Sequence, residues 1–361
     1  MFIIALQDEF TKYKDVGVDI DKIKKIQNRI GKNIEKTHHF LEFGKVISGF
    51  GHYAGMIEIG DKIMTLHTDG VGSKILIAQL MKKYDTIGID CIAMNVNDIV
   101  CVGSKPLGYL SYIALQKAND TLLKEITKGL VKGSKISNIA IVGGETAILP
   151  EIITGNSTGY NFDLAGMIFG IIEGRNKMIL GNKIKNGDVI IGIDSSGLHS
   201  NGYTLARKVL LEKYDFSDRP EFLETSLGKE LIKPTYIYSR TILNLVNEFG
   251  SRIIHGLSHI TGGAFTKLKR LNSNVDFVLD NLPQIKGIFK QIMKDGKIDM
   301  AEMYKTFNMG VGFCVVVSKD KSEEIMEIIK KDNLKCQAIG KIKSNGRGNT
   351  FIKNNNTLLK I

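Results

Sequence analysis

The sequence predicts an α+β protein of two domains, with an N-terminal domain over residues 1–174 and a C-terminal α+β sandwich domain over residues 175–361. A chain of 361 residues is long enough for two ordinary domains with buried cores. Strand-like and helix-like segments intermix without the strict alternation of a parallel βαβ fold. Between residues 173 and 188 the apolar pattern breaks into Gly, Asn and Lys, as at a domain boundary.

The first half begins with a polar, lysine-rich arm over residues 1–45, which we expect to pack against something other than itself. A helix is expected over residues 86–103, where apolar residues dominate. Short apolar runs bounded by turn residues predict strands. These strands cover residues 63–67, 107–114, 139–142 and 162–172.

The second half repeats such segments in a different order, beginning with the strand "DVIIGID" and the turn "SSGLHSNG". Helices are expected in "YTLARKVLLEKY", "PTYIYSRTILNLVNEFG" and "KSEEIMEIIKKD", and strands in "SRIIHGLSH" and "VGFCVVVS". The last 18 residues predict a hairpin with a loose end.

The composition is that of a globular protein, with 43% hydrophobic and 24% charged residues. No apolar run approaches the roughly 20 residues of a membrane span, and the opening "MFIIALQDEF" is too short for a signal-peptide core. The four cysteines lack zinc-site spacing and are expected to be buried. The net charge of +11 comes mostly from scattered lysines. We therefore expect a cytoplasmic protein that binds neither nucleic acid nor membranes, with a charge that suits a phosphorylated substrate.

A short glycine-rich turn, "HTDGVGSK", follows a predicted strand and carries two charged residues. Gly70 and Gly72 permit a tight turn whose backbone N–H groups approach an anion. Asp69 stands at the strand end, where a carboxylate can face a cation, and Lys74 could meet phosphate. The spacing does not fit a Walker A loop, and a plain turn is the alternative interpretation.

The predicted helix over residues 86–103 carries a polar stripe. Asp90, Asn97 and Asp98 fall within roughly a 100° arc of the helix, and nearly all other residues are apolar. Carboxylates on a buried helix are costly unless they are paired or bound to metal. The stripe indicates either a Mg²⁺–phosphate site or an internal network of hydrogen bonds and salt bridges.

The segment "AIVGGETAILP" predicts a short buried strand that ends at Gly143 and Gly144. Glu145 and Thr146 would then stand just past the strand end, as in a metal–phosphate site. An ordinary cap by Thr146 at the start of a helix is the alternative.

Two polar turns occur in the second half, "SSGLHSNGY" and "HITGGAF". His199 and His259 are candidate proton-transfer groups, although a histidine in a loop is often incidental. N–H groups at the start of the helix expected after Gly263 would suit a phosphate. A third glycine-rich segment, "SGFGHYAG", is not a dinucleotide fingerprint because a strand, not a helix, follows it, and a mobile flap remains an interpretation.

Taken in order, the motifs "SGFG", "TDGVGSK", "DTIGIDCIAMNVNDIV", "VGGETA", "DLAG", "SSGLHSNGY", "HITGGAF" and "FNMGVGF" resemble those of aminoimidazole ribonucleotide synthetases, also called phosphoribosylformylglycinamidine cyclo-ligases. The resemblance implies a homodimer whose N-terminal domains share one β-barrel. It also implies ring closure of formylglycinamidine ribonucleotide to 5-aminoimidazole ribonucleotide, with ATP phosphorylating the formyl oxygen and Mg²⁺ as a further cofactor.

The same resemblance implies roles for individual residues. It places His199 and His259 on the substrate side, and we take His199, His259 and Asp98 as the candidate catalytic residues. The implied metal ligands are Asp69, Asp98 and Glu145. ATP and its phosphates would meet Gly49, Gly51, Asp69, Gly70, Gly72, Lys74, Asp90, Asn97, Gly143, Gly144 and Thr146. The substrate would meet Ser200, Asn201, Gly202, Thr261, Gly262, Gly263 and Asn308.

Several positions depart from the family pattern without removing a proposed ligand. His52 and Tyr53 replace small or aliphatic residues, Leu198 replaces a usual proline, and Met309 stands where cysteine is common. The connection over residues 149–162 is longer than usual. The alternatives are another ATP-using protein of this architecture, of selenophosphate synthetase or hydrogenase-maturation dehydratase type, or a non-catalytic nucleotide-binding regulator.

Overall fold

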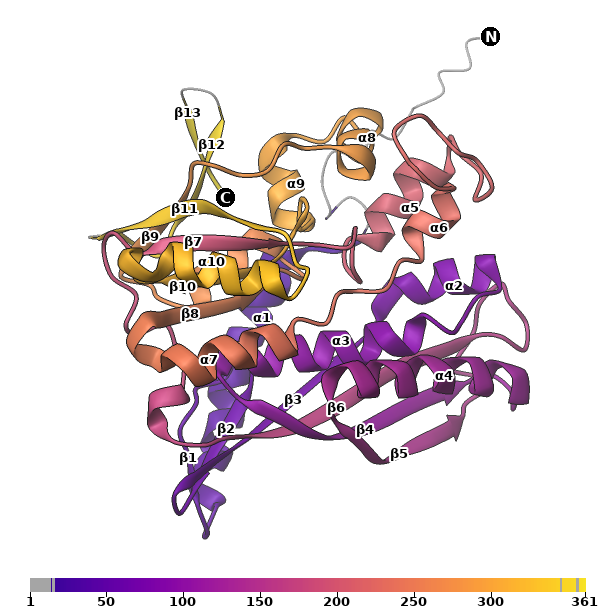
Figure 1. The fold of residues 1–361 in the computed structure, drawn as a ribbon. Helices are drawn as coiled ribbons and strands as arrows, with labels where there is room; N and C mark the ends of the chain where they lie inside the picture. The colour runs from indigo at the N-terminus through magenta and orange to yellow at the C-terminus, as the bar shows by residue number, and fades with distance from the viewer. Residues whose placement is uncertain (1–13, 15–16, 345, 355–356) are drawn as a thin grey trace.

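The computed structural model describes residues 14, 17–344, 346–354 and 357–361, which form two β-sheets with helices packed on them (Figure 1). The mixed α+β content is as predicted. Strands β1 to β6 build one sheet and strands β7 to β13 the other. The first 13 residues of the predicted arm lie outside the described residues.

The first sheet has the strand order β1-β2-β3-β6-β4-β5. All its pairs are antiparallel except β4 with β5. The strand predicted over residues 162–172 is confirmed with the same bounds. The strands are β1 (Lys45–Val46), β2 (Gly55–Ile59), β3 (Lys62–Gly70), β4 (Lys105–Leu115), β5 (Ala140–Ile148) and β6 (Phe162–Ile172).

Strand β5 corrects one prediction, because it runs on through Gly143 and Gly144 instead of ending there. The two glycines pair with Leu110 and Ser111 of β4. A Cβ on Gly144 would lie 2.3 Å from the Ser111 carbonyl oxygen, so glycine permits the close pairing of the two strands. Glu145 and Thr146 therefore lie within a strand, exposed to solvent.

Helices cover one face of this sheet. Helix α3 (Ile87–Ile99) packs on β3 and β6, and α4 (Asp120–Ser137) packs on α3. A Cβ on Gly88 would lie 2.3 Å from a backbone atom of α4, so the glycine lets the two helices approach closely. Every residue of α3 is buried. The 3₁₀ turn η4 (Val100–Val102) extends the helix almost to the predicted end at residue 103.

The opposite face of the first sheet is uncovered within the described residues. Odd-numbered residues of β3 face the helices, so Leu66 points the other way, together with Leu110 and Tyr112 of β4. Val142 of β5 is 69% exposed and lines a shallow apolar pocket with Leu110 on this face. The sheet is open, and the described residues of one chain form no closed barrel.

The second sheet has the strand order β13-β12-β9-β11-β7-β10-β8. Its strands are β7 (Val189–Asp194), β8 (Ile254–His259), β9 (Val275–Leu279), β10 (Val311–Val317), β11 (Cys336–Ser344), β12 (Thr350–Asn354) and β13 (Thr357–Lys360). The predicted C-terminal hairpin is β12 with β13. The helices around it are α5 (Tyr203–Leu211), α6 (Leu227–Leu231), α7 (Ser239–Ile253), α8 (Gly287–Asp295), α9 (Met300–Thr306) and α10 (Ser322–Lys331).

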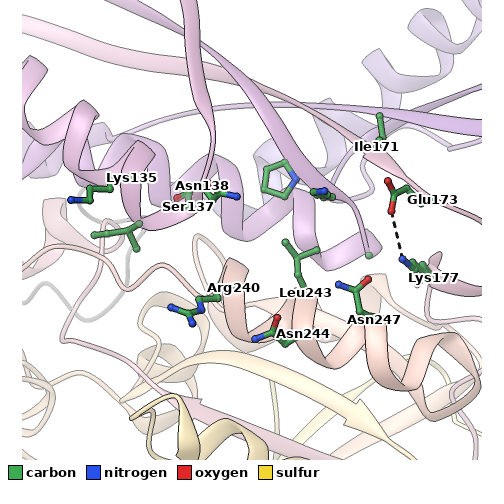
Figure 2. Close-up of a pocket in the computed structure, with 14 residues that line it drawn as sticks. Lys135, Ser137, Asn138, Ile171, Glu173, Lys177, Arg240, Leu243, Asn244 and Asn247 are labelled. Carbon is green, nitrogen blue, oxygen red and sulfur yellow. Dashed lines mark ion pairs between the residues drawn. The ribbon is translucent and has the colours of Figure 1, made fainter.

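One hydrophobic core runs through both halves, from Ile63 in the first sheet to Ile352 in the second. Helix α7 contacts β8 and the turn η5 (Arg175–Lys177), which follows the first sheet. A pocket of about 440 Å³ lies between α7 and the ends of α4 and β4 (Figure 2). No described helix has the length and hydropathy needed to cross a bilayer.

Candidate functional site

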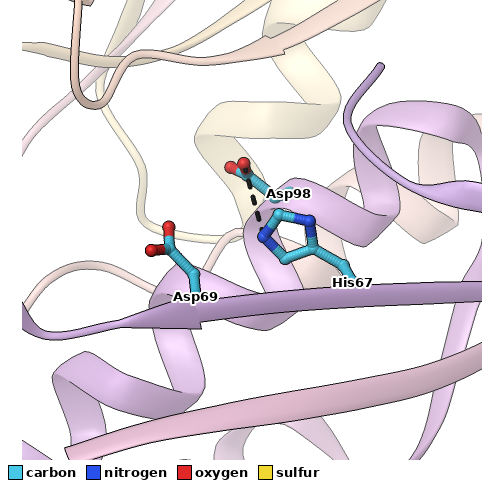
Figure 3. A group of neighbouring side chains, drawn as sticks. All are labelled: His67, Asp69 and Asp98. Atoms are coloured by element: carbon cyan, nitrogen blue, oxygen red, sulfur yellow. Dashed lines mark ion pairs between the residues drawn. The ribbon is translucent and has the colours of Figure 1, made fainter. Parts of the chain in front are cut away.

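Three side chains from two elements meet on the helix-covered side of the first sheet (Figure 3). His67 and Asp69 stand two residues apart on β3 and so point to the same face, toward Asp98 on α3. One ligand atom from each lies within 4.8 Å of the others. This group, the His67–Asp69–Asp98 cluster, is the set of described residues that could hold a metal ion.

The cluster concentrates negative charge in a desolvated place. Burial, and then the neighbouring Asp98 carboxylate, raise the pKa of Asp69 above its ordinary value. Burial alone would also raise the pKa of Asp98, but Lys267, His259 and His67 together lower it. The His67 Nε2 atom is buried without a hydrogen-bond partner and lies 3.7 Å from Asp98 Oδ2. A cation between these groups would remove the repulsion between the carboxylates.

Asp98 is held in place from the second sheet. His259, at the end of β8, donates from Nδ1 to Asp98 Oδ1 at 2.7 Å. The Lys267 ammonium lies 3.8 Å from Asp98 Oδ2, donates to Thr261 Oγ1 and stands 5.6 Å from the centre of the Tyr53 ring. Burial lowers the pKa of His259 against the pull of Asp98, so its imidazole is neutral near pH 7. His259 therefore orients Asp98, and its role in proton transfer stays a prediction.

A groove of about 750 Å³ opens beside His67. Gly49 and Gly51 of the glycine-rich segment form part of its wall, and Lys269 and Arg270 add positive charge. Gln27 of helix α1 (Ile20–Ile34) lines it from the N-terminal arm. A phosphorylated molecule in this groove could therefore reach the cluster.

Lys74 and Asp90 lie in a separate, fully buried ion pair. Lys74 Nζ is 2.8 Å from Asp90 Oδ1, and both side chains are 0% exposed. Asp90 also accepts hydrogen bonds from the backbone N–H and hydroxyl of Thr235 and from Ser200. The Lys74 ammonium also donates to the Lys233 carbonyl. These residues join the two halves of the chain here, and the phosphate contact expected of Lys74 and Asp90 stays a prediction.

Asn97 belongs to the same kind of internal network. Its side chain donates to the Tyr236 carbonyl at 2.7 Å and accepts from the Tyr238 N–H at 2.8 Å. The polar stripe of α3 thus divides, because Asp90 and Asn97 bind the segment over residues 233–238 while Asp98 faces the cluster.

The two predicted polar turns meet each other. The rings of His199 and His259 are 6.4 Å apart, and a Cβ on Gly262 would lie 3.2 Å from Asn201 Oδ1. His199 is buried, has a φ of 61° and accepts from the Ser196 N–H through Nε2. Burial lowers its pKa well below the ordinary value, so it is neutral.

Other residues expected to contact the substrate are fixed by contacts with the backbone. Asn308 binds Gly197 and Gly310, which ties two loops together. Gly202 and Gly263 have positive φ and begin α5 and the 3₁₀ helix η6 (Ala264–Arg270), which replaces the α-helix expected after the Gly-Gly pair. Substrate contacts at these positions stay predictions.

Glu145 does not join the cluster within one chain. Glu145 pairs with Tyr112 on β4, Tyr112 pairs with Ala165 on β6, and Ala165 pairs with Gly70 on β3. Glu145 therefore lies three strand spacings, roughly 14 Å, from β3. Opposite residues share a face, and this row of paired residues faces away from the helices and the cluster. Gly143, Gly144 and Thr146 lie on the same strand, also away from Asp69.

Two residues of the site, His67 and Lys267, are not among the candidates predicted from the sequence. His67 could have been found from its spacing, since residues two apart on a strand share a face with each other, and Asp69 was already a candidate. Lys267 follows the Gly-Gly turn by four residues, in "GGAFTKLKR". Only its place beside Asp98 distinguishes it from the other lysines of that segment.

The fold and the site define the class of protein. The family described as AIR synthase related protein, N-terminal domain, matches residues 51–172. The family described as AIR synthase related protein, C-terminal domain, matches residues 185–353. Within this class, the chain belongs to the phosphoribosylformylglycinamidine cyclo-ligase family.

Individual relatives support this assignment. The chain is 46% identical to a phosphoribosylformylglycinamidine cyclo-ligase of Methanobrevibacter smithii over 91% of its own length and 94% of the relative. It is 42% identical to that of Methanocaldococcus jannaschii, over 91% of each. Among solved structures, a chain of the HypE-HypF complex matches with a TM-score of 0.63 at 20% identity, over 86% of this chain and 92% of that one. This last likeness shows a shared fold alone.

Proposed function

We propose that the protein closes the imidazole ring of 5-aminoimidazole ribonucleotide from formylglycinamidine ribonucleotide, with ATP converted to ADP and phosphate. The observation that carries the proposal is the His67–Asp69–Asp98 cluster beside a groove lined by Lys269 and Arg270, in a chain 46% identical to a cyclo-ligase. An amide oxygen leaves poorly, so ATP phosphorylates the formyl oxygen, the amidine nitrogen attacks the activated carbon, and phosphate departs.

The residues of the cluster fit Mg²⁺ bound with nucleotide phosphates. One or two carboxylates are the usual protein contribution to such a site, and Asp69 and Asp98 would provide two. The ion would supply positive charge to the transferred phosphoryl group. His259 and Lys267 would hold Asp98 in position, while Lys269, Arg270 and the segment with Gly49 and Gly51 would face anionic groups in the groove. We assign residues 1–174 to the ATP and Mg²⁺ domain and 175–361 to the second domain.

The assay is direct. Purified protein, formylglycinamidine ribonucleotide, ATP and Mg²⁺ should yield ADP and an aminoimidazole in equal amounts. Absence of aminoimidazole, with or without ADP, would contradict the cyclo-ligase activity. It would leave another ATP-using enzyme of this fold, of selenophosphate synthetase or hydrogenase-maturation type, or a nucleotide-binding regulator. The identity to cyclo-ligases over most of the chain disfavours both alternatives.

Replacing Asp69 should weaken the binding of Mg²⁺. In Asp69→Asn, the Mg²⁺ concentration for half-maximal activity should rise at least roughly tenfold, because a charged ligand is lost. His67→Gln should shift it less, since Mg²⁺ prefers oxygen ligands over imidazole. Titrating activity with Mg²⁺ at saturating ATP measures both. Asp61→Asn, in the exposed β2–β3 turn, is the matched control. Equal shifts in Asp69→Asn and Asp61→Asn would contradict the metal assignment.

A homodimer in which two first sheets face each other as a barrel would explain why one face of this sheet is uncovered. The uncovered face around Leu110, Tyr112 and Val142 would be buried, and such a face is unusual on a monomer. The outer strand β5 would also be brought against the partner. If Glu145 supports the metal site, it must do so in the other subunit, because it cannot reach Asp69 in its own chain.

Mixed dimers test this arrangement. Asp98→Asn and Glu145→Gln should each be nearly inactive, but co-expressed chains should regain about a quarter of wild-type activity, because half the dimers are mixed and each of those holds one intact site. Dimers purified through two different tags should show about half. Mixed dimers no more active than either parent would exclude a shared site, and a fully active Glu145→Gln would exclude any role for Glu145.

A further inference from the structure

A second cavity lies away from the cluster, between the two halves of the chain (Figure 2). Helix α7 provides one wall through Arg240, Leu243, Asn244 and Asn247, whose spacing places them on one face of the helix. The last turn of α4 and the start of β4 provide the other wall. The volume of about 440 Å³ is that of a small-molecule site.

The cavity is strongly basic. Lys105, Lys135, Lys177 and Arg240 line it, with Glu173 as the acidic residue among the lining side chains. Glu173 pairs with Lys177 at 3.6 Å, the contact drawn in Figure 2. Within the described part of the chain, Lys105, Lys135 and Arg240 form no ion pair. The negative C-terminal end of α4 stabilises the charge of Lys135, but it leaves the charges of Lys105 and Arg240 without a partner among the described residues.

A buried hydroxyl provides an independent sign of a missing ligand. Ser137 is 6% exposed and lines the cavity, and its Oγ has no hydrogen-bond partner. Buried polar groups without partners are rare in native proteins, and each one calls for an explanation. The amides of Asn138, Asn244 and Asn247 border the same space. An acceptor-rich ligand would satisfy Ser137 and neutralise the cations at once.

We propose that this cavity binds a small phosphomonoester at a site separate from the cyclo-ligase centre. The phosphate meets Arg240, Lys105 and Lys135, and Ser137 Oγ donates to it. The asparagine amides bind the hydroxyl or ring groups of the rest of the ligand, against the apolar side chains of Pro106 and Leu243. A ligand held in this way bridges the first sheet and helix α7. The inference does not depend on the proposed activity, because none of these residues belongs to the cluster or its groove.

Calorimetric titration of the full-length protein with ribose 5-phosphate, AMP and inorganic phosphate tests the proposal. We expect the Kd of one class of binding site to rise at least tenfold in Arg240→Gln and in Lys105→Gln. The matched control is Arg219→Gln, an exposed arginine outside the cavity, which should bind as the unchanged protein does. A preference for ribose 5-phosphate or AMP over inorganic phosphate would support a phosphomonoester. Stronger binding of inorganic phosphate would overturn that choice of ligand.

Ser137→Ala separates ligand binding from folding. The free protein loses no hydrogen bond in this variant and an unsatisfied buried hydroxyl is removed, so its thermal midpoint should be unchanged or higher while the affinity for the probe falls several-fold. Turnover without the probe should stay at the wild-type level in Arg240→Gln. Equal affinity in Arg240→Gln, Ser137→Ala and Arg219→Gln, or the absence of any site sensitive to Arg240, would overturn the proposal whatever the cyclo-ligase assay shows.

Discussion

Asp98→Asn should reduce turnover by roughly 10³-fold, the size of effect expected when several kcal/mol of charge stabilisation by a metal centre are lost. The change keeps the shape of the side chain, and its oxygen can still accept the 2.7 Å hydrogen bond from His259. Removing the negative charge takes away a proposed ligand while the neighbouring Lys267 and His67 stay in place. Simultaneous measurement of ADP and aminoimidazole gives the loss in turnover.

The fold of this variant should be intact, because asparagine keeps the size of the side chain and its hydrogen bond with His259. The relieved repulsion from Asp69 opposes the lost attraction to Lys267. Circular dichroism and the thermal midpoint should match those of the unchanged protein within a few degrees. Asp61→Asn controls for loss of one acidic residue at an exposed position. An Asp98→Asn enzyme that turns over at the wild-type rate would refute the assignment of Asp98 to the metal centre. If Asp98→Asn does not fold, the same measurement is made on Asp69→Asn.

Lys74→Met should lower the free energy of unfolding by about 3–5 kcal/mol, because it leaves Asp90 buried and charged without its partner. Burial lowers the pKa of the Lys74 ammonium, against the opposing effect of Asp90. The methionine fills most of the same volume, so the lost charge dominates the effect. Urea unfolding followed by fluorescence and by circular dichroism measures the change.

The double variant Lys74→Met with Asp90→Asn should recover much of this stability, because no unpaired charge then remains and the amide oxygen can still accept from Thr235 and Ser200. Lys233→Met is a matched control, since Lys233 joins the network through its backbone carbonyl. If Lys74 instead served mainly to bind ATP phosphates, Lys74→Met would unfold at the wild-type urea concentration and show a raised KM for ATP. That outcome would return Lys74 to the phosphate role expected from the sequence.

Much of the fold followed from local patterns of residues. The apolar run over residues 162–172 is bounded by polar residues and forms β6 with the expected bounds. Helix α3 was expected because its length and apolar content suit a helix. The sequence predicts an end of strand β5 that is too early, because the Gly143–Gly144 pair is typical of a strand end. Only the pairing with Ser111, remote in sequence, shows why glycine is needed inside that strand.

The site was predicted less completely, for a different physical reason. Asp69 and Asp98 were identified as neighbours, and they are. The periodicity of α3 placed Asp90 and Asp98 on one stripe, but it carries no information about what packs on each part of that stripe. Thr235 and Lys74 complete the surroundings of Asp90, and neither lies on its helix. Such partners depend on tertiary packing, which helical spacing alone does not encode.

Helix α3, buried on every side, limits how the enzyme can move. It packs on β3 and β6 of the first sheet and on β8 of the second, so both halves share it as common core. A hinge motion that separated the halves would expose this apolar helix to water and break the ion pair between Lys74 and Asp90. Opening and closing around substrates must therefore come from smaller elements. The segment over residues 48–55, with its glycines beside the groove, is placed for that movement.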